Sequence, residues 1–330
     1  MNRRDTVLAL SALGAASVPF ASFAQQKKKL WRVGFFLSGS RRTGGANEDA
    51  FLAGLKQHGY EVGRNLIVDT RYAEGDPARW PPIADELIAL RPDVLVVSST
   101  GNTIVTKSKT KTIPIVMGSV GDPVGDGIVQ SLARPGGNVT GNSLQLVELG
   151  AKQIELMAES LPRVRRAALL TDLSQPKSQR ERYEQIANAA AAAKGLALAV
   201  HRINSPEEVR QVFRNLATRE ADALLIGPAP RFNVLRPEIC RSAADIRLPI
   251  IGFSEEWAQD GALMSYSPSW VEAYRRAAYF VDRILKGAKP SDLPIEQPTK
   301  FSLVINAGTA KALGIKIPGL ILLRADRVIE

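Results

Sequence analysis

DVLVVSSTGN, residues 93–102, and IPIVMGSVGDP, residues 113–123, decide the fold. Each begins with a short, almost continuous run of apolar residues, and glycine and hydroxyl residues follow directly after that run. Such runs are typical of strands in a parallel sheet, because helices cover both of its faces. The two stretches therefore predict an α/β protein built from strands that alternate with helices.

The same alternation extends along the chain in two series. Before residue 93, apolar runs at 32–37 and 65–72 alternate with amphipathic stretches at 47–58 and 77–90. After the run at 138–143 the rhythm restarts, with expected helices at 148–160, 179–194, 206–219 and through Cys240, and expected strands at 166–171, 196–202, ADALLIG and LPIIGF. Right-handed crossovers between parallel strands then give two doubly wound parallel-sheet lobes.

RPGGNVTGNS, residues 134–143, lies between the two series and is rich in Gly, Asn and Ser. This composition favours turns and a change of chain direction. We therefore expect a hinge between the lobes here, within Gly136–Gly141.

The first 24 residues have the order of an export signal. Arg3 and Arg4 precede an apolar stretch from Thr6 to Val18, and Ser22-Phe23-Ala24 offers small residues at the positions that signal peptidase reads. We predict cleavage before Gln25 and a periplasmic protein, the alternative being a buried N-terminal helix. The export route stays open, because the paired arginines fit the twin-arginine system but also occur in general secretory signals.

Composition excludes several classes of protein. The chain has 330 residues, 45% of them hydrophobic and only 23% charged, which is enough to build two domain cores and too apolar for a disordered chain. The single cysteine, Cys240, forms no internal disulfide, and His58 and His201 add too few ligands for a zinc cluster. Beyond the signal, no apolar run is long enough to span a membrane. The net charge of +10 is scattered along the chain, so we expect no nucleic-acid partner.

The sequence also lacks the motifs of common enzymes. It has no phosphate-binding Gly-Lys-Ser/Thr loop, no GxGxxG after a strand, no GxSxG and no His-Glu-x-x-His. We therefore predict a protein without a cofactor, a metal or a catalytic site.

Hydroxyl residues gather where strands of the first series end. In open parallel sheets ligands bind beyond the carboxyl ends of the strands, and there the chain carries Ser38, then Ser99 and Thr100, then Ser119 and Asp122. Such side chains, next to the amides of helix N-termini, suit a ligand carboxylate. The alternative is that they only cap the following helices.

The second series offers acids and an aromatic residue at comparable positions. Asp172 ends one strand, and Phe253 and Glu256 follow the last one, with Glu255 beside them. A carboxylate in a closed cleft neutralises a ligand ammonium group, and an aromatic face adds stacking or cation–π contact. We predict a site for a small polar or zwitterionic solute, in which the choice of acid stays open.

Four long strings carry a family resemblance: residues 55–75 (LKQHGYEVGRNLIVDTRYAEG), 113–141 (IPIVMGSVGDPVGDGIVQSLARPGGNVTG), 261–268 (GALMSYSP) and 276–306 (RAAYFVDRILKGAKPSDLPIEQPTKFSLVIN). With them the chain resembles the periplasmic substrate-binding proteins of ABC transporters, in the branch of tryptophan- and tyrosine-type components. The resemblance implies the type I periplasmic-binding fold and a ligand enclosed between the lobes. Carried over by position, Ser99, Thr100 and Ser119 match the loops that hold the ligand carboxylate.

The resemblance also implies a domain layout and partners. Crossings between the lobes are expected near Gly141, Phe253 and Pro290. The first lobe would then hold residues 25–141 with about 254–290, and the second about 142–253 with 291–330. A monomer would deliver its ligand to an ABC permease and its ATPase.

Three rival functions remain. A regulator of the repressor type shares this fold, but it needs a helix-turn-helix segment, which is missing before Leu30. A secreted enzyme needs a nucleophile and base that the sequence does not supply. A periplasmic sensor that presents its ligand to a receptor differs from a transport component only in its partner.

Overall fold

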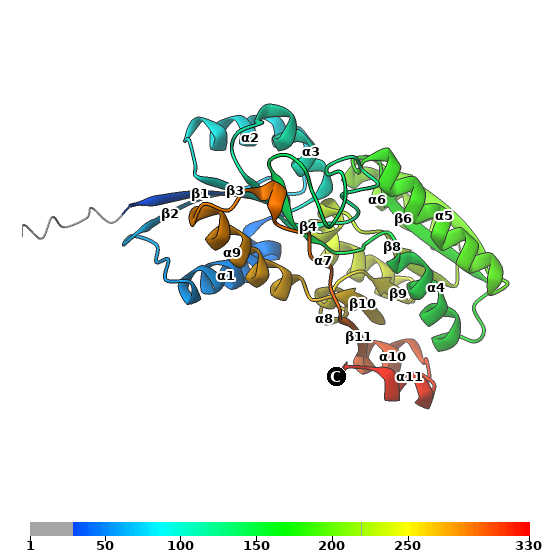
Figure 1. Cartoon of the computed structure of the whole chain (residues 1–330). Coiled ribbons are helices and arrows are strands. Elements are labelled where there is room, and N and C mark those ends of the chain that lie inside the picture. Colours follow the sequence, from blue (N-terminus) through cyan, green and yellow to red (C-terminus); the bar gives the residue numbers. More distant parts are fainter. Residues whose placement is uncertain (1–28, 219) are drawn as a thin grey trace, which may run out of the picture. The chain divides into compact units, whose positions relative to one another are not determined.

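The computed structural model describes residues 29–218 and 220–330, and residues 31–330 form one compact unit with two lobes (Figure 1). The predicted signal peptide and its cleavage point before Gln25 lie outside the described residues. Among the helices that are described, none combines the length and apolar character needed to cross a bilayer.

The first lobe contains a parallel sheet with the strand order β2-β1-β3-β4-β5. Its strands are β1 (Trp31–Leu37), β2 (Leu66–Tyr72), β3 (Val94–Val97), β4 (Ile115–Val120) and β5 (Val139–Ser143). Its helices are α1 (Arg41–Gln57), η1 (Pro77–Arg79), α2 (Trp80–Ala89) and α3 (Thr100–Lys109), joined later in the chain by α9 (Trp270–Leu285) and η2 (Pro290–Asp292).

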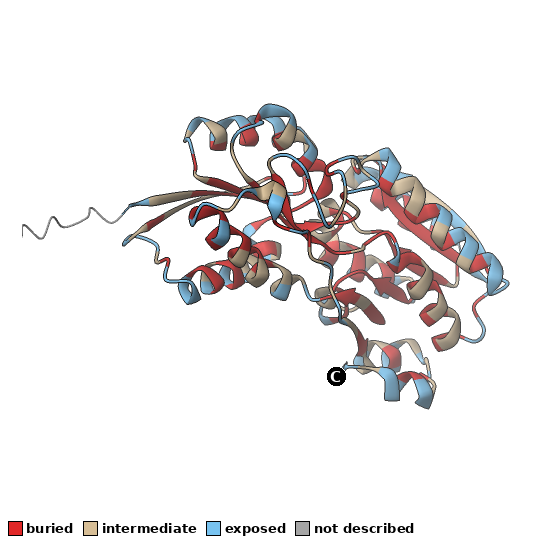
Figure 2. Cartoon of the chain, in the orientation of Figure 1, coloured by how far each residue is buried: buried red, intermediate tan, exposed pale blue. Residues whose placement is uncertain are grey.

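Helices cover both faces of this sheet, as the buried strands predict. On one face α9 packs against α1, and the ring of Phe35 lies 4.8 Å from that of Phe51 and 5.9 Å from that of Tyr274. On the other face Trp80 and Leu87 of α2 pack against Leu95 and Met117. The central strands of both lobes are buried, whereas β2 at one edge of this sheet, both edge strands of the second lobe's sheet and the outer helix faces are partly exposed (Figure 2). A sheet covered in this way presents its strand ends as the place for a site.

The second lobe has a larger, mixed sheet with the order β12-β11-β10-β9-β8-β6-β7. Its strands are β6 (Arg166–Asp172), β7 (Ala197–Ile203), β8 (Ala223–Ile226), β9 (Ile250–Gly252), β10 (Met264–Pro268), β11 (Phe301–Asn306) and β12 (Arg327–Ile329). Its helices are α4 (Leu149–Ser160), α5 (Lys177–Ala193), α6 (Pro206–Leu216), α7 (Pro230–Asp245), α8 (Glu255–Gln259), α10 (Ala307–Leu313) and α11 (Gly319–Arg324). The pairing of β10 with β11 is antiparallel, so this sheet is mixed and not wholly parallel as predicted.

The chain crosses between the lobes at three places. The first crossing follows β5, next to the expected position at Gly141. The second lies at Ser269 rather than near Phe253, because β10 is hydrogen-bonded between β9 and β11 and keeps residues 254–268 in the second lobe. The third comes after Glu296, whose amide donates to Gly141 O at 3.0 Å, and before β11, later than the expected Pro290.

Candidate functional site

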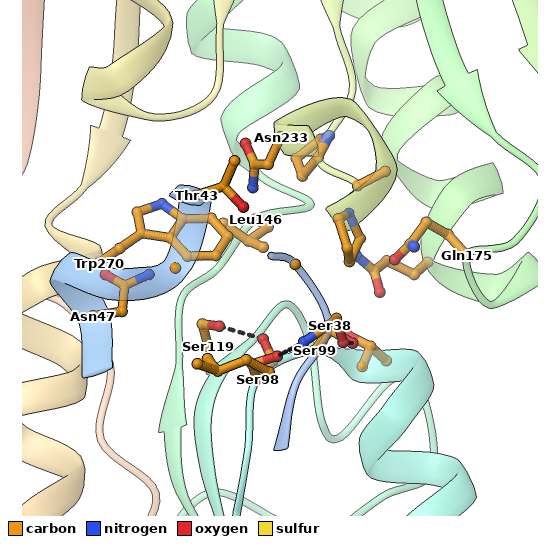
Figure 3. A pocket seen from close by; sticks show the side chains of 18 residues that line it. Ser38, Thr43, Asn47, Ser98, Ser99, Ser119, Leu146, Gln175, Asn233 and Trp270 are labelled. Carbon is orange, nitrogen blue, oxygen red and sulfur yellow. Dashed lines mark hydrogen bonds between the residues drawn. The ribbon is translucent and has the colours of Figure 1, made fainter. Parts of the chain in front are cut away.

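A cavity of about 60 Å³ lies where the strand ends of the first lobe meet helix starts of the second. The first lobe contributes the ends of β1, β3 and β4 and the first turns of α1. The second contributes Gln175 and Gln179 at the start of α5 and Pro228–Pro230 at the start of α7. Leu146, which follows the first crossing, and Trp270, which follows the second, complete the wall. In Figure 3 the serines lie below, Trp270 and Asn47 on the left, Asn233 above and Gln175 on the right.

The lining of this cavity carries no charged side chain among the described residues. It consists of small hydroxyl residues, the carboxamides Asn47, Gln175, Gln179 and Asn233, and apolar groups. A net charge enclosed here would have no counter-charge in contact, and burial of an unpaired charge is strongly unfavourable. The site is therefore suited to a molecule whose net charge is zero.

Three of the predicted hydroxyl residues form one network at the strand ends. Ser38 Oγ lies 2.7 Å from Ser99 Oγ, and Ser38 N donates to Ser98 Oγ at 2.7 Å. Ser119 Oγ donates to Ser98 O and lies 3.0 Å from the hydroxyl of Tyr274. These contacts occupy the hydroxyl groups with neighbouring protein atoms and fix the shape of the rim.

Ser99 is also the N-cap of α3. Its Oγ accepts from Asn102 N at 3.4 Å, while Asn102 Oδ1 accepts from Ser99 N at 2.9 Å, so the two residues form a capping box. The capping interpretation therefore applies to Ser99, although its side chain still borders the cavity.

Thr100 differs from Ser99, because its hydroxyl hydrogen is not used in a cap, whereas Ser99 Oγ donates to Asn102 Oδ1 at 3.1 Å. Thr100 Oγ1 accepts from Gly121 N at 3.3 Å. Thr100 also begins α3, and the first amides of a helix have no acceptor inside the helix. Thr100 thus borders the cavity with a hydroxyl group next to the positive end of a helix dipole.

Five buried polar atoms of the lining have no hydrogen-bond partner among the described residues. Three are acceptors and two are donors: Asn47 Oδ1, Gln179 Oε1, Asn233 Oδ1, Gln175 Nε2 and Trp270 Nε1. Buried polar groups in proteins are almost always satisfied, so a cluster of exceptions around one cavity indicates a ligand or ordered water. Prediction from strand ends missed Asn47, Asn233 and Trp270, since all three lie within helices.

Phe253, Glu256 and Asp122 do not line this cavity. Phe253 is fully buried and its ring lies 6.3 Å from that of Trp270, so it supports the cavity wall from behind. Glu256 lies on the partly exposed side of α8. Asp122 is engaged elsewhere, because its carboxylate lies 3.2 Å from Arg182 Nη1 of the second lobe.

Asp172 lies in a second, smaller cavity that shares Leu146, Gln175, Gln179 and Pro228 with the first. Its Oδ1 accepts from Ser174 N at 2.8 Å, and its Oδ2 lies 3.1 Å from Arg231 Nε. Burial raises the pKa of Asp172, and these partners act in the opposite direction. Of the predicted site residues, Ser38, Ser99, Thr100 and Ser119 thus surround one cavity and Asp172 its neighbour.

The two lobes also contact each other outside the cavities. Arg182 Nη2 of α5 donates to Asp126 Oδ1 at 3.0 Å, and Ser178 Oγ donates to the same atom at 2.7 Å. At a second place Arg42 Nη2 of α1 donates to Val234 O of α7 at 3.1 Å. These contacts place the lobes in a closed arrangement over the cavity.

The chain is similar in sequence and in fold to known proteins of one family. A family model described as ABC transporter substrate binding protein matches residues 40–329. A tyrosine-binding protein of Clostridioides difficile is 27% identical over 274 residues, which cover 81% of this chain and 76% of that protein. A crystal structure of a conserved domain protein from Vibrio cholerae matches 91% of this chain and 100% of its own, with a TM-score of 0.83 and 29% identity. The structure of an ABC domain in complex with L-Trp from Streptococcus pneumonia gives a TM-score of 0.83 at 25% identity, covering 91% and 99% of the two chains.

Proposed function

Because the chain belongs to the ABC transporter substrate-binding protein family, we propose that it encloses a neutral, zwitterionic amino acid with an apolar or aromatic side chain. The observation that carries the ligand class is the cavity lining, which is rich in hydrogen-bonding groups and has no charged side chain among the described residues. A zwitterion has zero net charge but needs donors for its carboxylate and acceptors for its ammonium group. The lining offers both.

The carboxylate binds at the start of α3. There Thr100 Oγ1 donates, and the dipole of the helix favours negative charge. Ser38 and Ser99 hold this rim in place through their 2.7 Å contact.

The ammonium group binds to carboxamide oxygens rather than to an acid. Asn47 Oδ1 of α1 and Asn233 Oδ1 of α7 are buried acceptors without partners, and they come from opposite lobes. An ammonium group donates three hydrogen bonds, so one ligand group links the two lobes. This replaces the acid expected at Asp172 or Glu256.

The ligand side chain packs between Trp270, Leu146 and Pro228. Aromatic rings stack well on such surfaces, which agrees with the L-Trp and tyrosine named for the similar proteins. Closure of the lobes then removes the ligand from water, and the closed form is presented to an ABC permease and its ATPase.

Export and the absence of catalysis belong to the same proposal. Family members are binding proteins, and a periplasmic location requires removal of the segment before Gln25. A chain that serves a receptor instead would bind its ligand in the same cavity, so pull-down of a permease or of a receptor by the closed form distinguishes the two.

Calorimetric titration with L-tryptophan, L-tyrosine and L-phenylalanine tests the ligand class. We expect at least one of them to bind, and its methyl ester and its N-acetyl derivative each to bind about 100-fold more weakly, because each derivative removes one charged partner. A derivative that binds as tightly as the free amino acid would contradict a site for both charged groups.

The two residues at the start of α3 should respond differently to removal of their hydroxyl groups. Thr100→Val should weaken binding about 10- to 100-fold, since it removes a hydrogen bond to a charged group. Ser99→Ala should instead lower the free energy of unfolding by about 1 kcal/mol through loss of the N-cap, with little change in affinity. Titration and urea unfolding of both variants separate these roles, and the reverse pattern would assign carboxylate binding to Ser99.

A further inference from the structure

The second cavity has room for one water-sized group. Its volume is about 20 Å³, and it adjoins the first cavity at Gln175 and Gln179, which line both cavities. A space of this size admits a water or a hydroxyl group. Leu146 and Pro228 also line both cavities, so a side chain that packs on them in the first lies next to the second.

Two buried carboxamide atoms beside this small space lack a hydrogen-bond partner among the described residues: the acceptor Gln179 Oε1 and the donor Gln175 Nε2. The charged groups of Asp172 and Arg180 also line the space, and each is held in an ion pair. Asp172, Gln175 and Gln179 are only 1%, 7% and 5% exposed. One hydroxyl group can donate to Gln179 Oε1 and accept from Gln175 Nε2, which an apolar group or a simple ion cannot do.

The protein holds the two charged groups of this cavity in place. Asp172 accepts from Ser174 N and lies beside Arg231, as described above. Arg180 Nε lies 3.7 Å from Glu184 Oε1, and Glu184 itself accepts from Thr171 Oγ1 at 2.8 Å and from Arg202 at 2.7 Å. Both charged groups are therefore fixed in position before any ligand enters.

We propose that the second cavity receives a hydroxyl group at the far end of the ligand side chain, and that it selects a phenol over a phenyl ring. The inference rests on the proposed function, in which the amino and carboxyl groups bind in the first cavity. It adds a subsite lined by Asp172, Gln175, Gln179 and Arg180, in which the unpartnered atoms Gln175 Nε2 and Gln179 Oε1 bind the ligand hydroxyl.

L-Tyrosine and L-phenylalanine test this subsite, because they differ only in that hydroxyl. The wild type should bind tyrosine about 10- to 100-fold more tightly than phenylalanine, since the hydroxyl contacts charged groups. In Gln175→Leu the affinity for tyrosine should fall more than that for phenylalanine, until the two ligands differ by less than about threefold. Asp172→Asn, which keeps the size of the side chain, should reduce the same difference.

Gln211→Leu is the matched control, because Gln211 bonds to Asn215 on the exposed surface of α6, away from both cavities. It should leave both affinities unchanged, and thermal melts should show that every variant is folded. Equal binding of tyrosine and phenylalanine by the wild type would overturn the subsite, whose cavity would then hold only structural water. Failure of the wild type to bind any of the three aromatic amino acids would overturn the proposed function and the subsite with it.

Discussion

Gly141→Ala should lower the free energy of unfolding by about 3 to 5 kcal/mol, a large part of the total stability of a protein of this kind. Gly141 lies on β5 with φ at 124°, a backbone conformation that side-chain-bearing residues rarely adopt. A Cβ there would lie 2.5 Å from Met117 N and closer still to Met117 O. Both are backbone atoms of the paired strand β4, so relief requires breaking the register Met117↔Gly141.

Gly137→Ala is the matched control for this prediction. Gly137 has φ at 105°, but no atom lies within 4 Å of the position that a Cβ would take. Only backbone strain remains in this variant, so we expect its free energy of unfolding to fall by about 1 to 2 kcal/mol. Urea unfolding of both variants measures the difference, and equal losses would contradict a clash between β4 and β5 as the main cause.

The fold could be predicted largely because its strands are local, apolar runs. VLVV of β3 and ALLI of β8 are buried on both faces, and such runs identify a parallel sheet from sequence alone. The second crossing could not be placed in this way. The strand β10 is MSYSP, whose serines at 265 and 267 interrupt the apolar run that would identify it from sequence. It belongs to the second lobe because it pairs with β9 and β11, and this pairing cannot be read from the local sequence.

The candidate site could be predicted in part for a similar reason. The rule for strand ends located Ser38, Ser99, Thr100 and Ser119, because parallel strands bring their ends together whatever the tertiary detail. This rule does not apply to residues that lie within helices, such as Trp270. It also does not indicate that Asp122 forms an ion pair with Arg182 of the other lobe. Those outcomes depend on how the lobes meet.

Arg182→Ala should weaken ligand binding about 10- to 100-fold although Arg182 lines neither cavity. Its guanidinium group lies 3.2 Å from Asp122 Oδ2 and 3.0 Å from Asp126 Oδ1, and both acids belong to the first lobe. The side chain of Asp126 is completely buried, and burial raises the pKa of its carboxyl group. Removal of the arginine leaves this carboxylate in the closed form with Ser178 as its remaining partner across the interface.

The substitution destabilises the closed form and not the open form, because opening of the lobes returns Asp126 to water, where it needs no partner. A smaller closed population reduces the apparent affinity by the same factor, and the ligand should dissociate faster with little change in its association rate. Arg71→Ala is the control, since Arg71 pairs with Glu86 at 2.6 Å entirely within the first lobe. Stopped-flow titration and small-angle scattering of both variants, with and without ligand, measure the rates and the closure. If Arg182→Ala bound and closed like the wild type, the ion pairs between the lobes would have no part in holding the ligand, and its affinity would rest on the cavity contacts alone.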